Sequence, residues 1–115
     1  MGKILVVEDN DVLRSSVVQA LVENGHNVSE VGDGEEATER LQEESYDVVL
    51  TDMRMPFMGG AELARQLRAR RRTLKLLCIS GYTGGSELEF SGDFLAKPFS
   101  RDELLAKVRE VLDRR

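Results

Sequence analysis

The feature that most constrains the fold of this chain is a set of short, unbroken apolar runs separated by segments with a helical pattern. Four of these runs cover residues 4–7, 48–51, 76–79 and 94–96. A weaker extended pattern covers residues 28–31, where only the two end positions are apolar. Unbroken rather than alternating apolar runs are typical of strands that are covered on both faces, as in parallel sheets. We therefore expect an α/β fold with a five-stranded parallel sheet.

Segments with helical spacing lie between the apolar runs. The apolar positions of the four predicted helices are Leu13, Val17, Ala20 and Leu21; Ala37 and Leu41; Leu63, Ala64 and Leu67; and Leu104, Val108, Val111 and Leu112. Two of these helices have a clear start, because Asp33 and Ser100 are each followed three residues later by a glutamate, as in a capping box. Residues 81–93 contain four glycines, so we expect about one or two helical turns there at most.

Length and composition favour a single domain that does not depend on disulfide bonds. A chain of 115 residues has room for one hydrophobic core, so we expect one domain over residues 1–115. Its 16 basic and 21 acidic residues give a net charge of −5, which argues against nucleic acid as the main partner. Cys78, the single cysteine, lies in an apolar run and should pack in the core. No apolar stretch approaches the roughly 20 residues that span a bilayer, and we expect a cytoplasmic protein without membrane contact.

Polar residues with particular chemistry follow four of the apolar runs. They are Glu8 and Asp9, Asp52, Ser80 and Lys97. Ligands of open parallel sheets bind beyond the carboxyl ends of the strands, so we expect these side chains to share one pocket. Glu8 and Asp9, here called the acid pair, should both lose solvation there. With Asp52 they would form a cluster that is repulsive unless a cation lies among them. Oxygen ligands alone favour a hard cation such as Mg²⁺.

Such a pocket would suit a phosphoryl group. Asp52 precedes a Pro-Gly loop, and its carboxylate can attack a phosphoryl group and hold it as an acyl phosphate. A metal ion would bridge carboxylate and phosphoryl oxygens, while Lys97 and the Ser80 hydroxyl would contact other phosphoryl oxygens. A simpler interpretation stays open for each residue alone. The acid pair could belong to a solvated loop in which one acid or Asn10 caps the next helix, Lys97 could be a surface lysine, and Ser80 could be a strand-end cap.

Taken together, the motifs resemble the receiver domain of bacterial two-component response regulators over essentially the whole chain. The matching segments are 4–10, 47–56, 59–60, 79–81 and 97–99. The resemblance implies a flavodoxin-like, doubly wound fold with strand order 2-1-3-4-5. It also implies a shortened fourth helix within 81–93, because the span from Ser80 to Lys97 is several residues shorter than is usual in the family.

The resemblance also implies a role for each candidate residue. Asp52 would be phosphorylated by the phosphohistidine of a partner, either a histidine kinase or a histidine phosphotransfer domain. Mg²⁺ would be bound by the acid pair, by Asp52 and by the backbone carbonyl of Arg54. Lys97 would contact the phosphoryl group, and Ser80 and Phe94 would form the switch that changes a protein-interaction face. Phe94 stands where a tyrosine is commoner, so a signal through a phenolic hydroxyl is not expected.

Two other functions stay open. A Mg²⁺-dependent phosphohydrolase with an aspartyl-phosphate intermediate would also need acids at strand ends. Enzymes of the haloacid dehalogenase type, however, usually carry a second aspartate two residues after the nucleophile, where this chain has Arg54. A receiver-like binding module that is never phosphorylated is the other alternative.

The sequence leaves open what reads the signal. Segments 80–84 and 94–100 resemble receivers attached to hybrid sensor histidine kinases, so both a stand-alone regulator and a part of a larger protein stay open. We expect a monomer or weak dimer that acts by protein contact on an unidentified target, without direct binding to nucleic acid. It would be no enzyme beyond catalysing its own phosphorylation and dephosphorylation.

Overall fold

Five parallel strands form the centre of the molecule. The computed structural model describes residues 2–52, 75–80 and 93–113. The strands are β1 (Lys3–Val7), β2 (Asn27–Val31), β3 (Val48–Asp52), β4 (Lys75–Ser80) and β5 (Asp93–Ala96). Neighbouring strands all pair in parallel, in the order β2-β1-β3-β4-β5. The predicted doubly wound sheet and its strand order are therefore confirmed.

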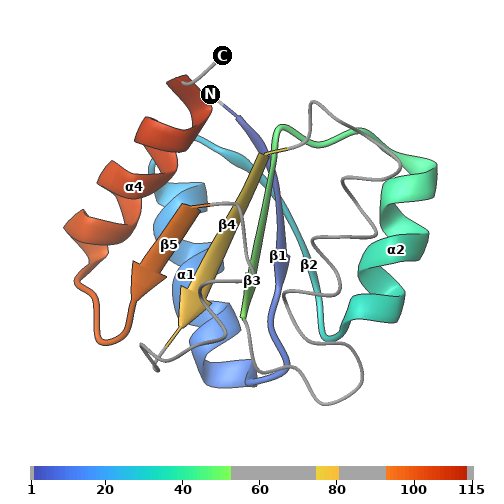
Figure 1. Cartoon of the computed structure of the whole chain (residues 1–115), viewed down its shortest axis with the longest axis horizontal. Helices are drawn as coiled ribbons and strands as arrows, with labels where there is room; N and C mark the ends of the chain where they lie inside the picture. Colours follow the sequence, from blue (N-terminus) through green and yellow to red (C-terminus); the bar gives the residue numbers. More distant parts are fainter. Residues whose placement is uncertain (1, 53–74, 81–92, 114–115) are drawn as a thin grey trace.

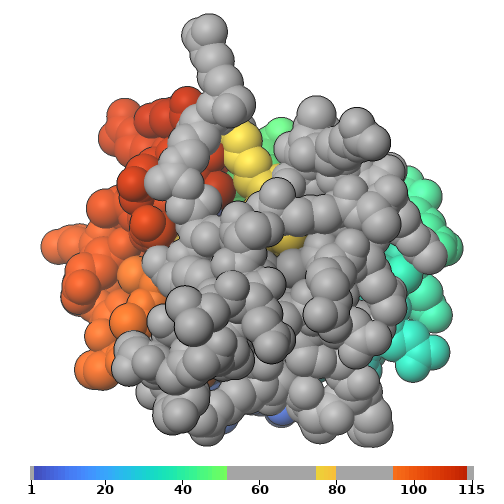
Figure 2. Space-filling view, viewed as in Figure 1, coloured from blue at the N-terminus to red at the C-terminus, as the bar shows by residue number. Residues whose placement is uncertain are grey.

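Helices cover both faces of this sheet. The described helices are α1 (Asp11–Glu23), α2 (Gly34–Glu43) and α4 (Arg101–Asp113). Helices α1 and α4 lie on one face of the sheet, and α2 lies on the other (Figure 1). Figure 2 shows α4 and α2 at opposite edges of the molecule. With cover on both faces, successive residues of a central strand are buried alternately against one layer and the other, which explains why the apolar runs are unbroken.

The interior strand β1 shows this alternation directly. Ile4 and Val6 are fully buried in a cluster with apolar residues of α1 and α4, while Leu5 and Val7 are fully buried in a second cluster with residues of α2. Cys78 is buried in the second cluster, so its predicted place in the core is confirmed. Truncating one such buried aliphatic side chain to alanine typically costs about 2–5 kcal/mol. The sheet is therefore a rigid base for whatever lies at its edges.

Short polar contacts fix where the helices begin. Asn10 is the N-cap of α1, and its side-chain oxygen accepts a hydrogen bond from the backbone N–H of Leu13 at 2.9 Å. The capping box predicted at Ser100 is complete, whereas at the start of α2 the Glu36 side chain accepts from the N–H of Gly32 instead of from that of Asp33. Asp33 accepts from the N–H of Glu36 at the start of α2, and at the start of α4 Ser100 and Glu103 each donate a backbone N–H to the other's side chain. These caps satisfy backbone donors that have no partner inside the helix.

Some predicted elements fall outside the described residues. The helix expected to carry Leu63, Ala64 and Leu67 lies there, as does nearly all of the shortened helix expected within 81–93. In the parts of the chain that the structure describes, no helix is both long and apolar enough to cross a membrane.

Candidate functional site

The register of β1 and β3 places two of the candidate acids at neighbouring strand ends. Val7 lies opposite Thr51 in the parallel pairing of these strands. Glu8 directly follows the end of β1, and Asp52 is the last residue of β3. Both acids therefore stand at the carboxyl end of the sheet on adjacent strands, which is where open α/β sheets bind ligands.

The other two candidate positions lie on the far side of β3 at the same edge. Asp52 pairs with Ile79 of β4, so Ser80 follows one position later. Ser80 in turn pairs with Ala96 of β5, and Lys97 follows directly. The strands point the same way, toward the lower edge in Figure 1, so the backbone brings all four run ends to one edge of the sheet.

The two members of the acid pair lie in different environments. The Glu8 side chain is buried, with only 3% of its surface exposed, and its Oε1 accepts a hydrogen bond from the backbone N–H of Asn10 at 3.0 Å. Asp9 is exposed. The expectation that both carboxylates lose solvation is therefore wrong for Asp9, because the chain has already left the strand and turned toward solvent at that position. Only Glu8 is desolvated.

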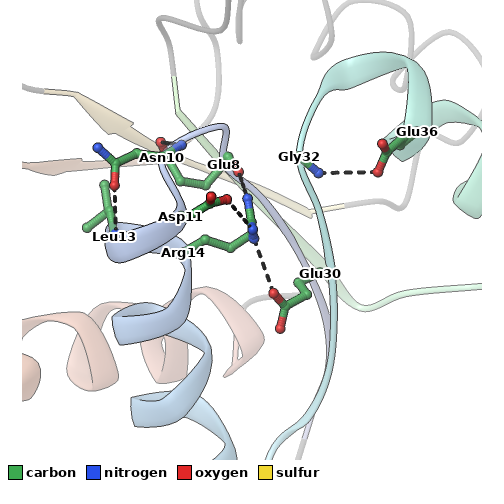
Figure 3. A network of polar contacts seen from close by, with 8 residues as sticks. All are labelled: Glu8, Asn10, Asp11, Leu13, Arg14, Glu30, Gly32 and Glu36. Carbon is green, nitrogen blue, oxygen red and sulfur yellow. Dashed lines mark hydrogen bonds and ion pairs between the residues drawn. The ribbon is translucent and has the colours of Figure 1, made fainter.

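Arg14 holds the backbone beside the acid pair. Its Nη1 donates to the carbonyl oxygen of Glu8 at 2.8 Å, its Nε donates to Glu30 at 3.1 Å, and its Nη2 donates to Asp11 (Figure 3). The hydrogen bond to Asp11 is the main reason why the pKa of Arg14 is raised above its ordinary value. Arg14 does not stand out in the sequence. A cation one helical turn after an acid pair is the signal that would have found it.

Lys97 is anchored on both sides along the chain. It is partly buried, β5 precedes it, and a cis peptide bond joins it to Pro98. Two residues later Phe99 packs against the core cluster that lies between the sheet and helices α1 and α4. The position of Lys97 is therefore fixed by the strand before it and by the partly buried Phe99 ring after it.

Other predicted site residues are described only in part. Asp52, Ser80 and Phe94 belong to strands whose backbone is described, while their side chains lie outside the described part of the structure. Arg54 lies outside the described residues. Among the side chains that the structure describes, no three acidic, histidine or cysteine residues gather as a metal-binding group.

The donor chemistry at this edge fits Mg²⁺. A buried carboxylate and an exposed one, Glu8 and Asp9, stand at the end of β1, with Asp52 on the adjacent strand end. Mg²⁺ prefers one or two carboxylates together with water and phosphate oxygens. Among the residues that the structure describes, Cys78 is buried in the core and His26 belongs to the opposite end of the sheet, so neither is a ligand at this edge.

That opposite end contains an open cavity with a different character. Its volume is about 720 Å³, and its lining includes Gly2, His26, Asp47 and Lys75 but none of the candidate site residues. His26 Nδ1 accepts a hydrogen bond from the N–H of Gly2 at 3.3 Å, and burial lowers the pKa of His26. This cavity and the predicted chemistry are therefore at opposite ends of the sheet.

Comparison with known proteins identifies the family. A family model for the response regulator receiver domain matches residues 4–109. The response regulator receiver protein CpdR of Brucella abortus is 35% identical over 117 residues, which cover 97% of this chain and 98% of that protein. The autoinducer sensor kinase/phosphatase CqsS of Vibrio cholerae is 37% identical over 114 residues, which cover 92% of this chain but only 17% of the kinase.

A solved structure agrees with these relatives. The receiver domain of the sensor histidine kinase PA1611 from Pseudomonas aeruginosa has a TM-score of 0.89 and is 31% identical, with 98% of each chain covered. That structure has a magnesium ion coordinated in its active site cleft. The fold, the order of the strand-end residues and these similarities agree, and the chain belongs to the family of response regulator receiver domains, the signalling modules of two-component systems.

Proposed function

We propose that this chain is a phosphoacceptor that takes a phosphoryl group onto Asp52 from the phosphohistidine of a histidine kinase or a histidine phosphotransfer domain. The whole of residues 1–115 would act as one receiver domain. The observation that carries the proposal is the strand register, in which Val7 opposite Thr51 puts Glu8 and Asp52 side by side at the carboxyl edge.

In the proposed reaction an Asp52 carboxylate oxygen attacks phosphorus in line with the departing histidine nitrogen. The P–N bond breaks as the new P–O bond forms, and the imidazole nitrogen keeps the electron pair and takes up a proton. Lys97 and the Ser80 hydroxyl would hold two of the phosphoryl oxygens, because both follow strands that end beside β3. Such positioning supplies much of the rate of a phosphoryl transfer.

Mg²⁺ would be held by Glu8, Asp9, Asp52 and the carbonyl oxygen of Arg54. When bound, it would offset the charge that collects on the phosphoryl oxygens. The magnesium ion in the related receiver of PA1611 supports this assignment. So does the buried Glu8 carboxylate, because a desolvated carboxylate gains more from a nearby cation than a solvated one does.

Output would follow from the charge that phosphorylation adds. The new group carries negative charge and strong acceptor oxygens. We propose that Ser80 moves toward it and that Phe94 turns into the space that Ser80 leaves. The face that includes β5 and α4 would then change shape and be read by another protein. Phe94 and Ser80 lie on neighbouring strands, β5 and β4, with Ser80 opposite Ala96.

The setting of the signal stays a proposal as well. Similarity to a sensor kinase supports a histidine kinase as the phosphoryl donor. The chain spans nearly all of CpdR but under a fifth of the sensor kinase CqsS, so relatives of both lengths contain this unit. A single cysteine, Cys78, buried in the core, suits a reducing cytoplasm.

The test is mass spectrometry after incubation with acetyl phosphate. The chain should gain the mass of one phosphoryl group only when Mg²⁺ is present, and Asp52→Asn should abolish the gain. Asp47→Asn is the matched control, because Asp47 lies directly before β3, at the other end of the same strand, and should leave the gain intact. Mass gain that persists in Asp52→Asn would overturn the assignment.

Incubation with other phosphoryl donors separates the alternatives. A phosphohydrolase would turn over p-nitrophenyl phosphate continuously, whereas a receiver should show no sustained turnover of that compound. A binding module that is never phosphorylated would show no mass gain with acetyl phosphate or with a phosphorylated kinase.

A further inference from the structure

Arg14 contacts the peptide group that joins the two members of the acid pair. The carbonyl oxygen of Glu8, which accepts from Arg14 Nη1 at 2.8 Å, belongs to the planar peptide between Glu8 and Asp9. Both acidic side chains leave the backbone from the two ends of that plane. Holding the carbonyl therefore restricts where each side chain leaves the backbone, and with it the directions open to each carboxylate.

The guanidinium is itself held from two further elements. Glu30 of β2 accepts from its Nε at 3.1 Å, and Asp11 in the first turn of α1 accepts from its Nη2 (Figure 3). The backbone of Gly32 lies beside it, since a Cβ placed at Gly32 would stand 3.8 Å from Nη1. The Arg14 side chain is only 19% exposed. The guanidinium is planar, its N–H donors have a fixed geometry, and it forms hydrogen bonds to Glu8, Asp11 and Glu30. Such a group is well suited to hold one peptide plane in place.

Two backbone hydrogen-bond donors also hold the turn. The N–H of Glu8 donates to the carbonyl of Val31 at 3.1 Å, and the N–H of Asn10 donates to the Glu8 carboxylate at 3.0 Å. Neither contact can be removed by changing a side chain outside the acid pair. The contact from Arg14 can, so its contribution is open to a clean test.

We propose that Arg14 is a positioning residue for the metal site and sets the Mg²⁺ affinity of the acid pair by fixing the peptide plane between Glu8 and Asp9. The inference rests on the proposed function, which assigns Mg²⁺ to these two acids. The charge of Arg14 acts in the opposite direction, because a cation near the site repels Mg²⁺. Asp11 and Glu30 offset that charge, which leaves geometry as the main contribution.

The test is Mg²⁺ binding to the unphosphorylated full chain, followed through backbone amide shifts and through the rise in melting temperature on adding the metal. Arg14→Lys keeps the positive charge but loses the planar set of N–H donors. It should weaken Mg²⁺ binding by about tenfold, the lower end of the loss seen when a group that orients a metal ligand is removed. Arg14→Met should also weaken binding, by less, because it also removes a repelling charge.

Lys3→Met is the matched control. Lys3 is a partly exposed cation paired with Glu44 at 3.4 Å, and it starts the same strand whose other end leads to the acid pair. Its removal should leave the Mg²⁺ dissociation constant unchanged. Acetyl phosphate should phosphorylate Arg14→Lys as fast as the parent at saturating Mg²⁺, with only the half-saturating Mg²⁺ concentration raised.

Each alternative role of Arg14 predicts a different set of results. If Arg14 acted through charge alone, Arg14→Lys would bind Mg²⁺ normally and Arg14→Met would bind it more tightly, and the inference would be overturned. If Arg14 only stabilised the fold, both variants would melt earlier without metal but keep the dissociation constant, which would also overturn it. A parent chain that binds Mg²⁺ but is never phosphorylated would refute the proposed function and leave the role of Arg14 standing.

Discussion

The two ends of the sheet use charged groups in different ways. At the amino end charged and polar side chains contact groups that the fold itself provides: Asp47 accepts from the N–H of Lys3 at 2.8 Å, and Lys75 donates to the carbonyl of Leu112 at 2.9 Å. At the carboxyl end Glu8 is buried, Asp9 is exposed beside it, and Asp52 ends the adjacent strand. Charges at the amino end therefore contact the fold itself, whereas the acid pair and Asp52 occupy neighbouring strand ends, an arrangement that would suit a bound cation.

The largest expected effect comes from neutralising the acid pair. Glu8→Gln with Asp9→Asn keeps the acceptor for the Asn10 N–H but removes both charges. Phosphorylation by acetyl phosphate at a fixed, subsaturating Mg²⁺ concentration should slow by at least about 100-fold, because the loss of ligands exceeds the loss of a group that orients one.

The same double variant should lose phosphorylation rate but should not lose stability in the absence of metal. Urea unfolding should give an unchanged or higher free energy of unfolding, since repulsion among the acids is relieved. A clear loss of stability would show that the carboxyl end, like the amino end, uses its charges to hold the fold.

A smaller effect is expected from Asp47→Ala at the amino end. This change removes the acceptor of the Lys3 backbone N–H and should lower the free energy of unfolding by about 1 kcal/mol. Phosphorylation at saturating Mg²⁺ should not change. If Asp47→Ala slowed phosphorylation without lowering stability, the amino end would contribute to the reaction, and the proposed difference between the two ends would be wrong.

The pH dependence of stability should show a further, gentler effect at the amino end. Burial lowers the pKa of His26 from its ordinary value of 6.5, so below that pH the unfolded chain binds a proton that the folded chain does not. The stability that neutral His26 contributes is therefore complete above pH 6.5 and is lost as the pH falls through the lowered pKa. Protonation would also remove the acceptor of the Gly2 N–H.

His26→Asn offers an uncharged acceptor in place of Nδ1 and cannot titrate. Urea unfolding between pH 7.5 and pH 5 should show a shallower fall in stability for this variant than for the parent. Asp47, Lys75 and Arg109 line the same cavity and are kept, so they contribute equally to both chains. Identical slopes would mean that His26 does not titrate as its burial implies.

The smallest effect is expected from Lys3→Met. Its ion pair with Glu44 joins two partly exposed side chains, 34% and 44% exposed, and water screens such a pair. The melting temperature should hardly change, and raising the salt concentration should not separate the variant from the parent. A marked drop would show that this exposed pair is worth more than its surroundings suggest.

Much of the fold could be predicted because strands that are buried on both faces have unbroken apolar sequences. The central runs of β1, β3 and β4 are unbroken because each residue packs against one helical layer or the other. The β2 pattern was weak because this strand lies at the edge of the sheet, where several of its residues are exposed or partly exposed. Strand order came from the family resemblance, since no single run carries information about its neighbours.

The candidate site was predictable where it depends on strand ends and not where it depends on side-chain directions beyond them. Glu8 followed from its place after β1, but the exposure of Asp9 is set by the turn into α1, which has no periodic pattern. Arg14 was missed because its partners come from three places along the chain, and Glu30 is 16 residues away. Contacts of that kind appear only once the strands are paired.

The central claim is that four strand ends meet around one metal ion, and paramagnetic broadening by Mn²⁺ in place of Mg²⁺ tests it most directly. Backbone amide signals should broaden together at the carboxyl edge, at Asp9, Asp52, Ser80 and Lys97. Signals at the amino end, such as that of Asp47, should stay sharp, because five strand residues at about 3.3 Å each separate the two ends. Broadening confined to the acid pair, or spread equally to the amino end, would contradict the account.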